Sequence, residues 1–191
     1  MNNTTDLFQF IACLPNLSER DFKSSVQEHA LNNLQILDQT QPSARKEYKK
    51  RLSNRATHFK ATVDRVNKRF RGKHGIAISS HNNEQHVRDF FHSAYYSAFF
   101  VARFALVSVG THDCTGHAAI DNLLKQEVIN RDPAKKAAAI ALAQSLSEWR
   151  EHRNLADYIM NETKISAIAN PQIIDRIALD LGSHFSAWGV P

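Results

Sequence analysis

FFHSAYYSAFFVARFALVSV, residues 90–109, is the stretch that decides the fold. It is apolar over most of the circumference of a helix, and a helix of that kind belongs at the centre of a bundle. Its most apolar part, residues 94–110, is too short for a membrane span of about 20 residues and contains Arg103. We therefore expect a central helix over residues 82–109 and no membrane-spanning segment.

Amphipathic helices are predicted on the N-terminal side of this stretch, because apolar residues recur there at three- or four-residue steps. The first follows a capping-box-like start at Ser18 and runs to Leu37. A narrow apolar stripe from Tyr48 to Phe70 indicates a much longer second helix, which ends before Gly72.

Three more helices are predicted on the C-terminal side. A short one covers residues 118–129. The Asp-Pro pair at 132–133 supplies an N-cap and a first-turn residue for a long helix that runs to Met160. The Asn-Pro pair at 170–171 repeats that start signal for the last helix.

The predicted fold class is all-α, an up-and-down helical bundle with an N-terminal helical extension. Residues 1–75 form the extension and include a long basic helix, residues 82–191 form the bundle, and one continuous core joins them. A chain of 191 residues suits this plan, because a domain typically takes about 100 to 200 residues. No strand-like alternation of useful length appears.

The composition predicts a globular protein of the cytoplasm. Hydrophobic residues make up 42% and charged residues 23% of the chain, which indicates neither a disordered nor a fibrous protein. Cys13 and Cys114 match no disulfide framework of the secreted kind. The N-terminal residues lack the basic flank and apolar core of a signal peptide. No cofactor is expected.

Positive charge is concentrated on the second predicted helix. Residues 45–73 hold twelve Lys or Arg against Glu47 and Asp64. Such a helix attracts phosphates, although a charge run is equally often a solvated helix face. The residues that we expect to contact nucleic acid, with three arginines from elsewhere, are Arg45, Lys49, Arg55, Arg65, Arg69, Lys73, Arg88, Arg103 and Arg150.

Arg153 stands where the apolar stripe of the predicted long C-terminal helix requires a core residue. A guanidinium on an inward face must be paired or must face a cleft, because an isolated buried charge is costly. In the structural interpretation, Arg153 pairs with Asp157 one turn later. In the functional one it lines a polar cleft with Arg150, His152 and Tyr158, where its planar fork binds phosphate or handles a ribose 2′-hydroxyl.

The central helix carries a polar stripe of its own, so two inward polar faces could converge on one site. The stripe occupies about a quarter-turn of arc. Alternatively, the tyrosine hydroxyls satisfy buried backbone groups and the arginine nearest the C-terminal end of the helix, Arg103, extends to water. The side chains of the stripe are Arg88, His92, Tyr95, Tyr96, Phe99 and Arg103.

Three segments follow one another in a suggestive order: SAYYSAFFVARFAL at 93–106, CTGHAAI at 114–120 and EHRNLADY at 151–158. In the first, an Ala-Tyr-Tyr triplet precedes an aromatic residue and Ala-Arg. The second holds Thr, Gly and His before a helix, and the third reads Arg-x-x-Ala-Asp-Tyr. In these features the chain resembles the HEPN family of helical proteins over residues 85–161.

The resemblance implies an up-and-down bundle, a homodimer and a site near the dimer cleft. Many HEPN proteins are metal-independent ribonucleases of toxin–antitoxin or antiviral defence systems. In those, an Arg holds the scissile phosphate and a His four to six residues later takes part in proton transfer from the 2′-hydroxyl. We therefore expect an RNA-acting protein that binds RNA or a nucleotide and has a nucleotidyltransferase or a defence-system protein as its partner. Its expected catalytic residues are Arg153, Asp157, Tyr158, His152 and His92.

The chain departs from the nuclease motif after Arg153. No His stands four to six residues beyond it, and Asp157 and Tyr158 stand there instead. This ending also occurs in HEPN proteins for which a binding or regulatory role is plausible. The alternative function is therefore a non-catalytic module that binds a partner protein, RNA or a nucleotide. An active enzyme would need His92, His152 or a tyrosine for the proton chemistry.

Other chemistry finds little support in the sequence. His112, Cys114 and His117 crowd one loop, but their spacing fits no common zinc site, so no metal is expected. The chain has no glycine-rich phosphate loop, no Gly-x-Ser-x-Gly turn and no His-Glu-x-x-His helix, which disfavours the hydrolase and nucleotide-binding classes that those motifs mark.

Overall fold

Helices make up almost all of the regular structure in this computed structural model, which describes residues 42–77, 81–110, 113–114, 116–158, 165 and 168–191. Within these ranges there is no strand, so the predicted all-α helical bundle is confirmed. The helix expected at residues 18–37 lies outside them. The elements are α4 (Pro42–Phe70), α5 (His81–Ser108), α6 (Ile120–Arg131), the 3₁₀ helix η3 (Pro133–Lys135), α7 (Lys136–Tyr158) and α9 (Pro171–Trp188).

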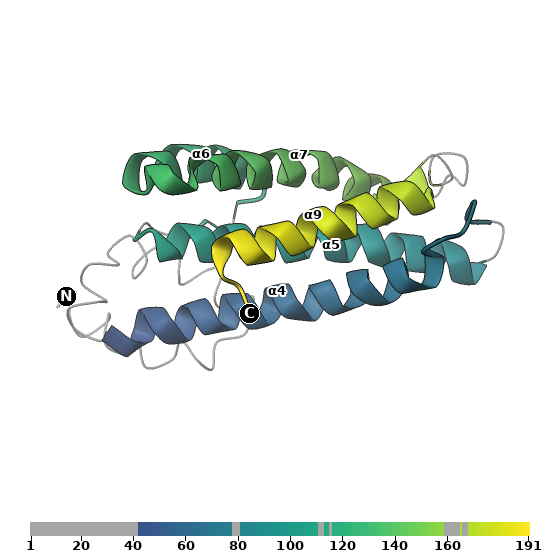
Figure 1. The fold of residues 1–191 in the computed structure, drawn as a ribbon, viewed down its shortest axis with the longest axis horizontal. Coiled ribbons are helices and arrows are strands. Elements are labelled where there is room, and N and C mark those ends of the chain that lie inside the picture. Colours follow the sequence, from purple (N-terminus) through teal and green to yellow (C-terminus); the bar gives the residue numbers. More distant parts are fainter. Residues whose placement is uncertain (1–41, 78–80, 111–112, 115, 159–164, 166–167) are drawn as a thin grey trace.

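The central position belongs to α5, as the residues at 90–109 predicted. This helix packs against α4, α6, α7 and α9 (Figure 1). From Phe90 to Val107, all of its residues are buried except His92 and Tyr96, which are half-buried. Among the helices that the structure describes, none combines the length and the hydropathy that a membrane span requires.

The apolar stripe of α4 packs against α5 and α9, and it belongs to the same buried cluster as the side chains of the other helices. Phe59 is the one half-buried member of the stripe. At the end of α4, Gly72 has φ of +74°, a left-handed backbone angle that a residue with a side chain rarely adopts. The stripe residues buried in the core are Tyr48, Leu52, Ala56, Val63, Val66 and Phe70.

Both ends of α9 are capped in the way its sequence indicates. The Asn170 side chain accepts a hydrogen bond from the backbone N–H of Gln172 at 2.8 Å, and Pro171 occupies the first turn. At the other end Gly189 adopts φ of +62°, and the N–H of Val190 donates to the carbonyl of Phe185 at 3.0 Å. These caps fix the length of the helix that covers α4 and α5.

The start of the long C-terminal helix differs from the prediction. Asp132 makes no side-chain cap, because its backbone closes the preceding helix: its N–H donates to the carbonyl of Val128 at 2.8 Å. Pro133 opens the one-turn η3, and α7 begins only at Lys136. The short helix α6 begins at Ile120, two residues later than predicted, after a turn whose carbonyl acceptor is Gly116.

Candidate functional site

Arg103 lies in the protein core and not on a surface that a phosphate can reach. The residue is 1% exposed. Its Nε donates to the Asp113 carboxylate at 3.0 Å, and its Nη2 donates to Asp113 Oδ2 at 2.5 Å and to the Tyr48 hydroxyl at 3.1 Å. Tyr48 in turn donates to Asp113 at 2.6 Å. The assignment of Arg103 to nucleic-acid binding and the expectation that it extends to water are therefore both wrong.

Arg153 projects from α7 toward α5, where its guanidinium has three polar neighbours. Nη2 donates to the Tyr96 hydroxyl at 3.1 Å, Nη1 donates to Asn154 Oδ1 at 3.1 Å, and Nε lies 2.6 Å from Asp157 Oδ2. Burial by itself lowers the pKa of Arg153, but Tyr96 and Asp157 outweigh it and raise that pKa above its ordinary value. The predicted ion pair between Arg153 and Asp157 is confirmed.

A histidine also contacts this ion pair, and it comes from the central helix. His92 Nδ1 lies 3.2 Å from Oδ2 and 3.3 Å from Oδ1 of Asp157. The His92 ring packs against Tyr96 and Phe59, with centroid distances of 4.7 and 6.1 Å, and its side chain is 41% exposed. Thus α5 and α7 together place an imidazole against the carboxylate that pairs with Arg153, although no histidine stands four to six residues after that arginine in the sequence.

Tyrosine rings surround the Arg153 guanidinium. Its carbon lies 5.9, 5.4 and 5.1 Å from the ring centroids of Tyr95, Tyr96 and Tyr158. Tyr158 is 69% exposed, which makes it a large aromatic surface next to the arginine. We call His92, Tyr96, Arg153, Asp157 and Tyr158 the arginine cluster.

A second polar group lies next to the arginine cluster. The Tyr95 hydroxyl is 2.8 Å from His117 Nδ1, and burial raises the pKa of Tyr95 to about 12, so this phenol stays protonated. Arg150 donates to the His117 carbonyl at 2.6 Å and lies 3.9 Å from Asp121. Arg150, expected to contact nucleic acid, therefore holds the segment before α6 in place.

His152 lies apart from the arginine cluster. Its ring packs on Phe91 at 5.2 Å, and its Nδ1 is buried without a hydrogen-bond partner among the described residues. Burial lowers the pKa of His152, so the neutral ring is favoured. Of the five residues predicted to be catalytic, the structure brings together the other four, which are His92, Arg153, Asp157 and Tyr158.

Arg88 links its own helix, α5, to the last described turn of α7. Its Nε and Nη2 donate to Glu84 at 2.8 and 2.7 Å, and its Nη1 donates to the backbone carbonyl of Ala156. This carbonyl lies in the last described turn of α7. Arg88 thus fixes the last turn of α7, which carries Asp157, against α5.

The basic residues of α4 fall into two groups. Arg45 and Lys49 are half-buried, and the Lys49 ammonium lies 4.8 Å from the centre of the Phe104 ring. Burial lowers the pKa of Lys49, with a smaller effect of Arg45. The other expected nucleic-acid-binding residues of this part of the chain are all exposed, and they are Arg55, Arg65, Arg69 and Lys73.

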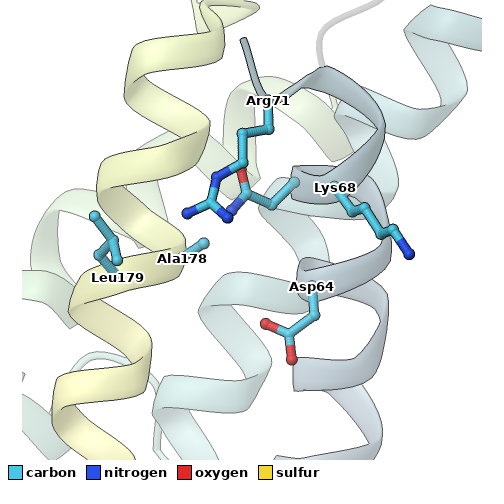
Figure 2. Close-up of a pocket in the computed structure, with 6 residues that line it drawn as sticks. Asp64, Lys68, Arg71, Ala178 and Leu179 are labelled. Carbon is cyan, nitrogen blue, oxygen red and sulfur yellow. The ribbon is translucent and has the colours of Figure 1, made fainter.

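Two of the hollows lined by residues that the structure describes lie beside α4. One lies between α4 and α9, and Figure 2 shows Arg71 and Asp64 on its α4 side and Leu179 on its α9 side. Two of its charged side chains have partners of opposite charge, since Arg71 lies 3.5 Å from Asp175 and Asp64 lies 2.6 Å from Lys60, and Lys68 adds a further cation to the lining. The described residues that line the other hollow all come from α4, and they are Arg51, Asn54, Arg55 and His58.

In comparisons with known proteins, no family model, no curated protein and no solved structure matches the chain. The resemblance to the HEPN family therefore stays a prediction. No group of three His, Cys, Asp or Glu side chains suited to a metal ion occurs within the described ranges, which do not include His112.

Two contacts described above were not predicted from the sequence, namely the one between Arg103 and Asp113 and the one between His92 and Asp157. Asp113, the counter-ion of Arg103, stands in a loop with no periodic pattern to assign it a face. The contact between His92 and Asp157 joins residues 65 positions apart, and no spacing rule connects them. The polar stripe of the central helix was the available signal, since it includes both His92 and Tyr96.

Proposed function

We propose that this protein is a metal-independent endoribonuclease whose catalytic groups are in the arginine cluster. The observation that carries the proposal is the contact of one carboxylate, Asp157, with both Arg153 and His92. A cation for the phosphate and an imidazole for the proton are the two groups that cleavage by a ribose 2′-hydroxyl requires. The resemblance to the HEPN family, with Arg153 matching its phosphate-binding arginine, points to the same reaction.

Each member of the cluster has a distinct part in the proposal. Arg153 binds the non-bridging oxygens of the scissile phosphate, because its planar fork suits them and its charge persists at any relevant pH. Asp157 accepts the Nδ1 proton of His92 and so leaves Nε2 as the basic nitrogen. Nε2 has no hydrogen-bond partner among the described residues. Tyr96 orients the guanidinium through its hydroxyl.

The chemical step needs no metal. The 2′-hydroxyl gives its proton to Nε2 of His92 as its oxygen forms a bond to phosphorus. The bond between phosphorus and O5′ then breaks, and the imidazolium returns the proton to O5′. The products are a 2′,3′-cyclic phosphate and a free 5′-hydroxyl, so atoms and charge balance without a further reactant.

One observation also favours the alternative function, a non-catalytic binding module. Arg153 already has Asp157, Tyr96 and Asn154 as neighbours, so a phosphate must compete with an intramolecular carboxylate. A non-catalytic module that uses the cluster to hold α5 and α7 together is therefore the second candidate function. A homodimer, a nucleotidyltransferase or defence-system partner and a place in toxin–antitoxin or antiviral systems rest on the HEPN resemblance alone.

The test is cleavage of single-stranded and structured RNA in the presence of EDTA. Wild type should cut, and Arg153→Ala and His92→Asn should each lower the rate about 100-fold or more, as expected for loss of an electrostatic or general-base group. Arg131→Ala is the matched control, since Arg131 forms an exposed i,i+4 pair with Glu127 that resembles the pair at Arg153. Thermal unfolding checks that every variant is folded.

Two outcomes overturn the proposal. If wild type does not cut any RNA, or if Arg153→Ala cuts as fast as Arg131→Ala, the cluster has no catalytic role and the binding module is supported. A substrate with a single 2′-deoxyribose at the cleaved position adds a mechanistic check, because cleavage there must stop when the attacking hydroxyl is missing.

A further inference from the structure

We propose that the exposed ring of Tyr158 is a stacking platform for an unpaired base of single-stranded RNA, beside the phosphate site at Arg153. This inference rests on the proposed function and deepens it, because it names single strands as the substrate and gives Tyr158 a part in binding. The sequence placed Tyr158 among the expected catalytic residues, and the proposed reaction has no step for it. We call this exposed ring the Tyr158 platform.

Tyr158 is the most exposed large apolar side chain in the described part of the chain. The residue is 69% exposed, and the other exposed member of this class, Leu179 on α9, is 59% exposed. The remaining tyrosines, Tyr48, Tyr95 and Tyr96, are buried or half-buried. A single exposed apolar side chain is common on protein surfaces, so the case for a ligand depends on what surrounds the ring.

The surroundings of the Tyr158 platform include the cation that binds phosphate in the proposed reaction. The Arg153 guanidinium carbon lies over the ring, 5.1 Å from its centroid. A cation over one face of an aromatic ring leaves the other face for a second planar group, and the high exposure of Tyr158 gives such a group access. A nucleotide carries both groups that fit here, because one ribose joins its anionic phosphate to its planar base.

Base stacking supplies a contact that a phosphate alone lacks at Arg153. The guanidinium already has a counter-ion, since its Nε lies 2.6 Å from Oδ2 of Asp157. A phosphate that displaces this carboxylate exchanges one ion pair for another, so the exchange by itself gains little. A base stacked on Tyr158 adds a contact for which Asp157 does not compete. The two contacts together therefore favour a nucleotide over a free phosphate ion.

Other aromatic rings extend this surface from Tyr158 toward α4. Arg153 donates to the Tyr96 hydroxyl, and the Tyr96 ring lies 4.7 Å from His92 and 5.5 Å from Phe59. All three of these rings are half-buried. Proteins that bind single-stranded nucleic acid combine cations for the backbone with aromatic side chains on which bases stack. The arginine cluster and Phe59 together provide both kinds of group.

The Tyr158 platform favours a single strand because its ligand is the face of an unpaired base. In an RNA duplex the bases are stacked on one another, and the narrow major groove keeps side chains away from their edges. Proteins that recognise RNA bases mostly bind loops and ends, whose bases stack on aromatic side chains. The net charge of +5 attracts both forms of RNA, so the exposed ring and not the charge discriminates between them.

The test uses a single strand that cannot be cleaved, an oligonucleotide of 2′-deoxyuridines with one 2-aminopurine in its middle. The fluorescence of 2-aminopurine falls when this base stacks, so titration with protein reports both stacking and affinity. Wild type should quench the probe. Tyr158→Ala should remove the quenching and bind about fivefold or more weakly, as expected for loss of one stacked base. Tyr158→Phe should keep the quenching, because the ring remains.

Leu179→Ala is the matched control, because it removes the other exposed large apolar side chain of the described residues. It should quench and bind the probe as wild type does, and thermal unfolding checks that every variant is folded. The platform is overturned if Tyr158→Ala behaves like Leu179→Ala. It is also overturned if Tyr158→Phe loses the quenching, which would assign the effect to the hydroxyl. A duplex that competes as well as the single strand overturns the preference for unpaired bases.

Cleavage of single-stranded RNA in the presence of EDTA separates this proposal from the proposed function. Tyr158→Ala should raise KM more than it lowers kcat, whereas Arg153→Ala and His92→Asn should lower kcat. If wild type shows the quenching that depends on Tyr158 but cuts no RNA, the nuclease alone is overturned. If wild type cuts RNA and Tyr158→Ala keeps the quenching and KM of wild type, the platform alone is overturned. A wild-type protein that neither binds nor cuts overturns both.

Discussion

Replacing Asp113 by Ala should be among the most destabilising substitutions in the described part of the chain. The change removes the counter-ion of Arg103, whose side chain is 2% exposed, while that of Asp113 is fully buried. Tyr48 and the Phe99 and Phe100 rings, 5.7 and 5.3 Å from the guanidinium carbon, would remain as neighbours of the buried charge. Breaking a buried ion pair from one side costs about 3 to 5 kcal/mol.

That loss is large against a typical total stability of about 5 to 15 kcal/mol. For a chain of this size, about 2 to 4 °C in Tm corresponds to each kcal/mol, so Asp113→Ala should lower Tm by about 6 to 20 °C. Urea unfolding followed by circular dichroism gives the free energy of unfolding directly. Asp121→Ala is the control, because its distant pair with Arg150 at 3.9 Å should contribute less than about 1 kcal/mol.

A double variant identifies the cause of the loss. Arg103→Met combined with Asp113→Leu removes both charges and should recover part of the stability, since apolar residues of similar volume often replace a buried pair without loss, while the buried Tyr48 hydroxyl loses its hydrogen bonds to both residues. The reasoning is refuted if Asp113→Ala costs no more than Asp121→Ala, or if the double variant is less stable than Asp113→Ala.

Three further outcomes concern α9 and its contacts. Burial lowers the pKa of His184, so its protonation favours the unfolded chain, and stability should fall as pH drops below about 6.5. When Tm is measured from pH 7.5 to 5, it should fall less steeply in His184→Gln than in wild type. The glutamine can replace the hydrogen bond that His184 makes with Ser145 at 2.9 Å but cannot be protonated. An equal dependence of Tm on pH in the two proteins would contradict this reasoning. Asn170→Ala should cost about 1 kcal/mol in urea unfolding through loss of the N-cap, and Asn170→Asp should cost less. Gly189→Ala should cost about 1 to 2 kcal/mol because of its positive φ, whereas Gly182→Ala, within the helix, should not destabilise.

Helix positions were predictable because the apolar periodicity of each helix is a local signal that tertiary packing only reinforces. The central helix, the stripe of α4 and the Asn-Pro start of α9 all follow from residues within a few turns of one another. The Asp-Pro pair at 132–133 led to a wrong start for the long C-terminal helix. The pair has the sequence of an N-cap, but the Asp132 backbone also ends α6, and its side chain makes no cap hydrogen bond.

The candidate site was predictable only in part, because half of it depends on contacts between helices. The pair of Arg153 and Asp157 lies within one turn and could be inferred from spacing alone. Whether His92 lies against Asp157 depends on how α5 is oriented about its axis relative to α7. The packing of large core side chains sets that orientation. The burial of Arg103 likewise depends on where a loop places Asp113.

The position of Asp157 between Arg153 and His92 has a consequence for how this site tolerates change. One carboxylate contacts two side chains on different helices, so its removal in Asp157→Ala breaks both contacts at once. Effects of substitutions at these three residues should therefore not add: the loss measured at one depends on whether the others are present. Asp157 thus couples Arg153 to His92, and a variant that lacks its carboxylate loses both contacts.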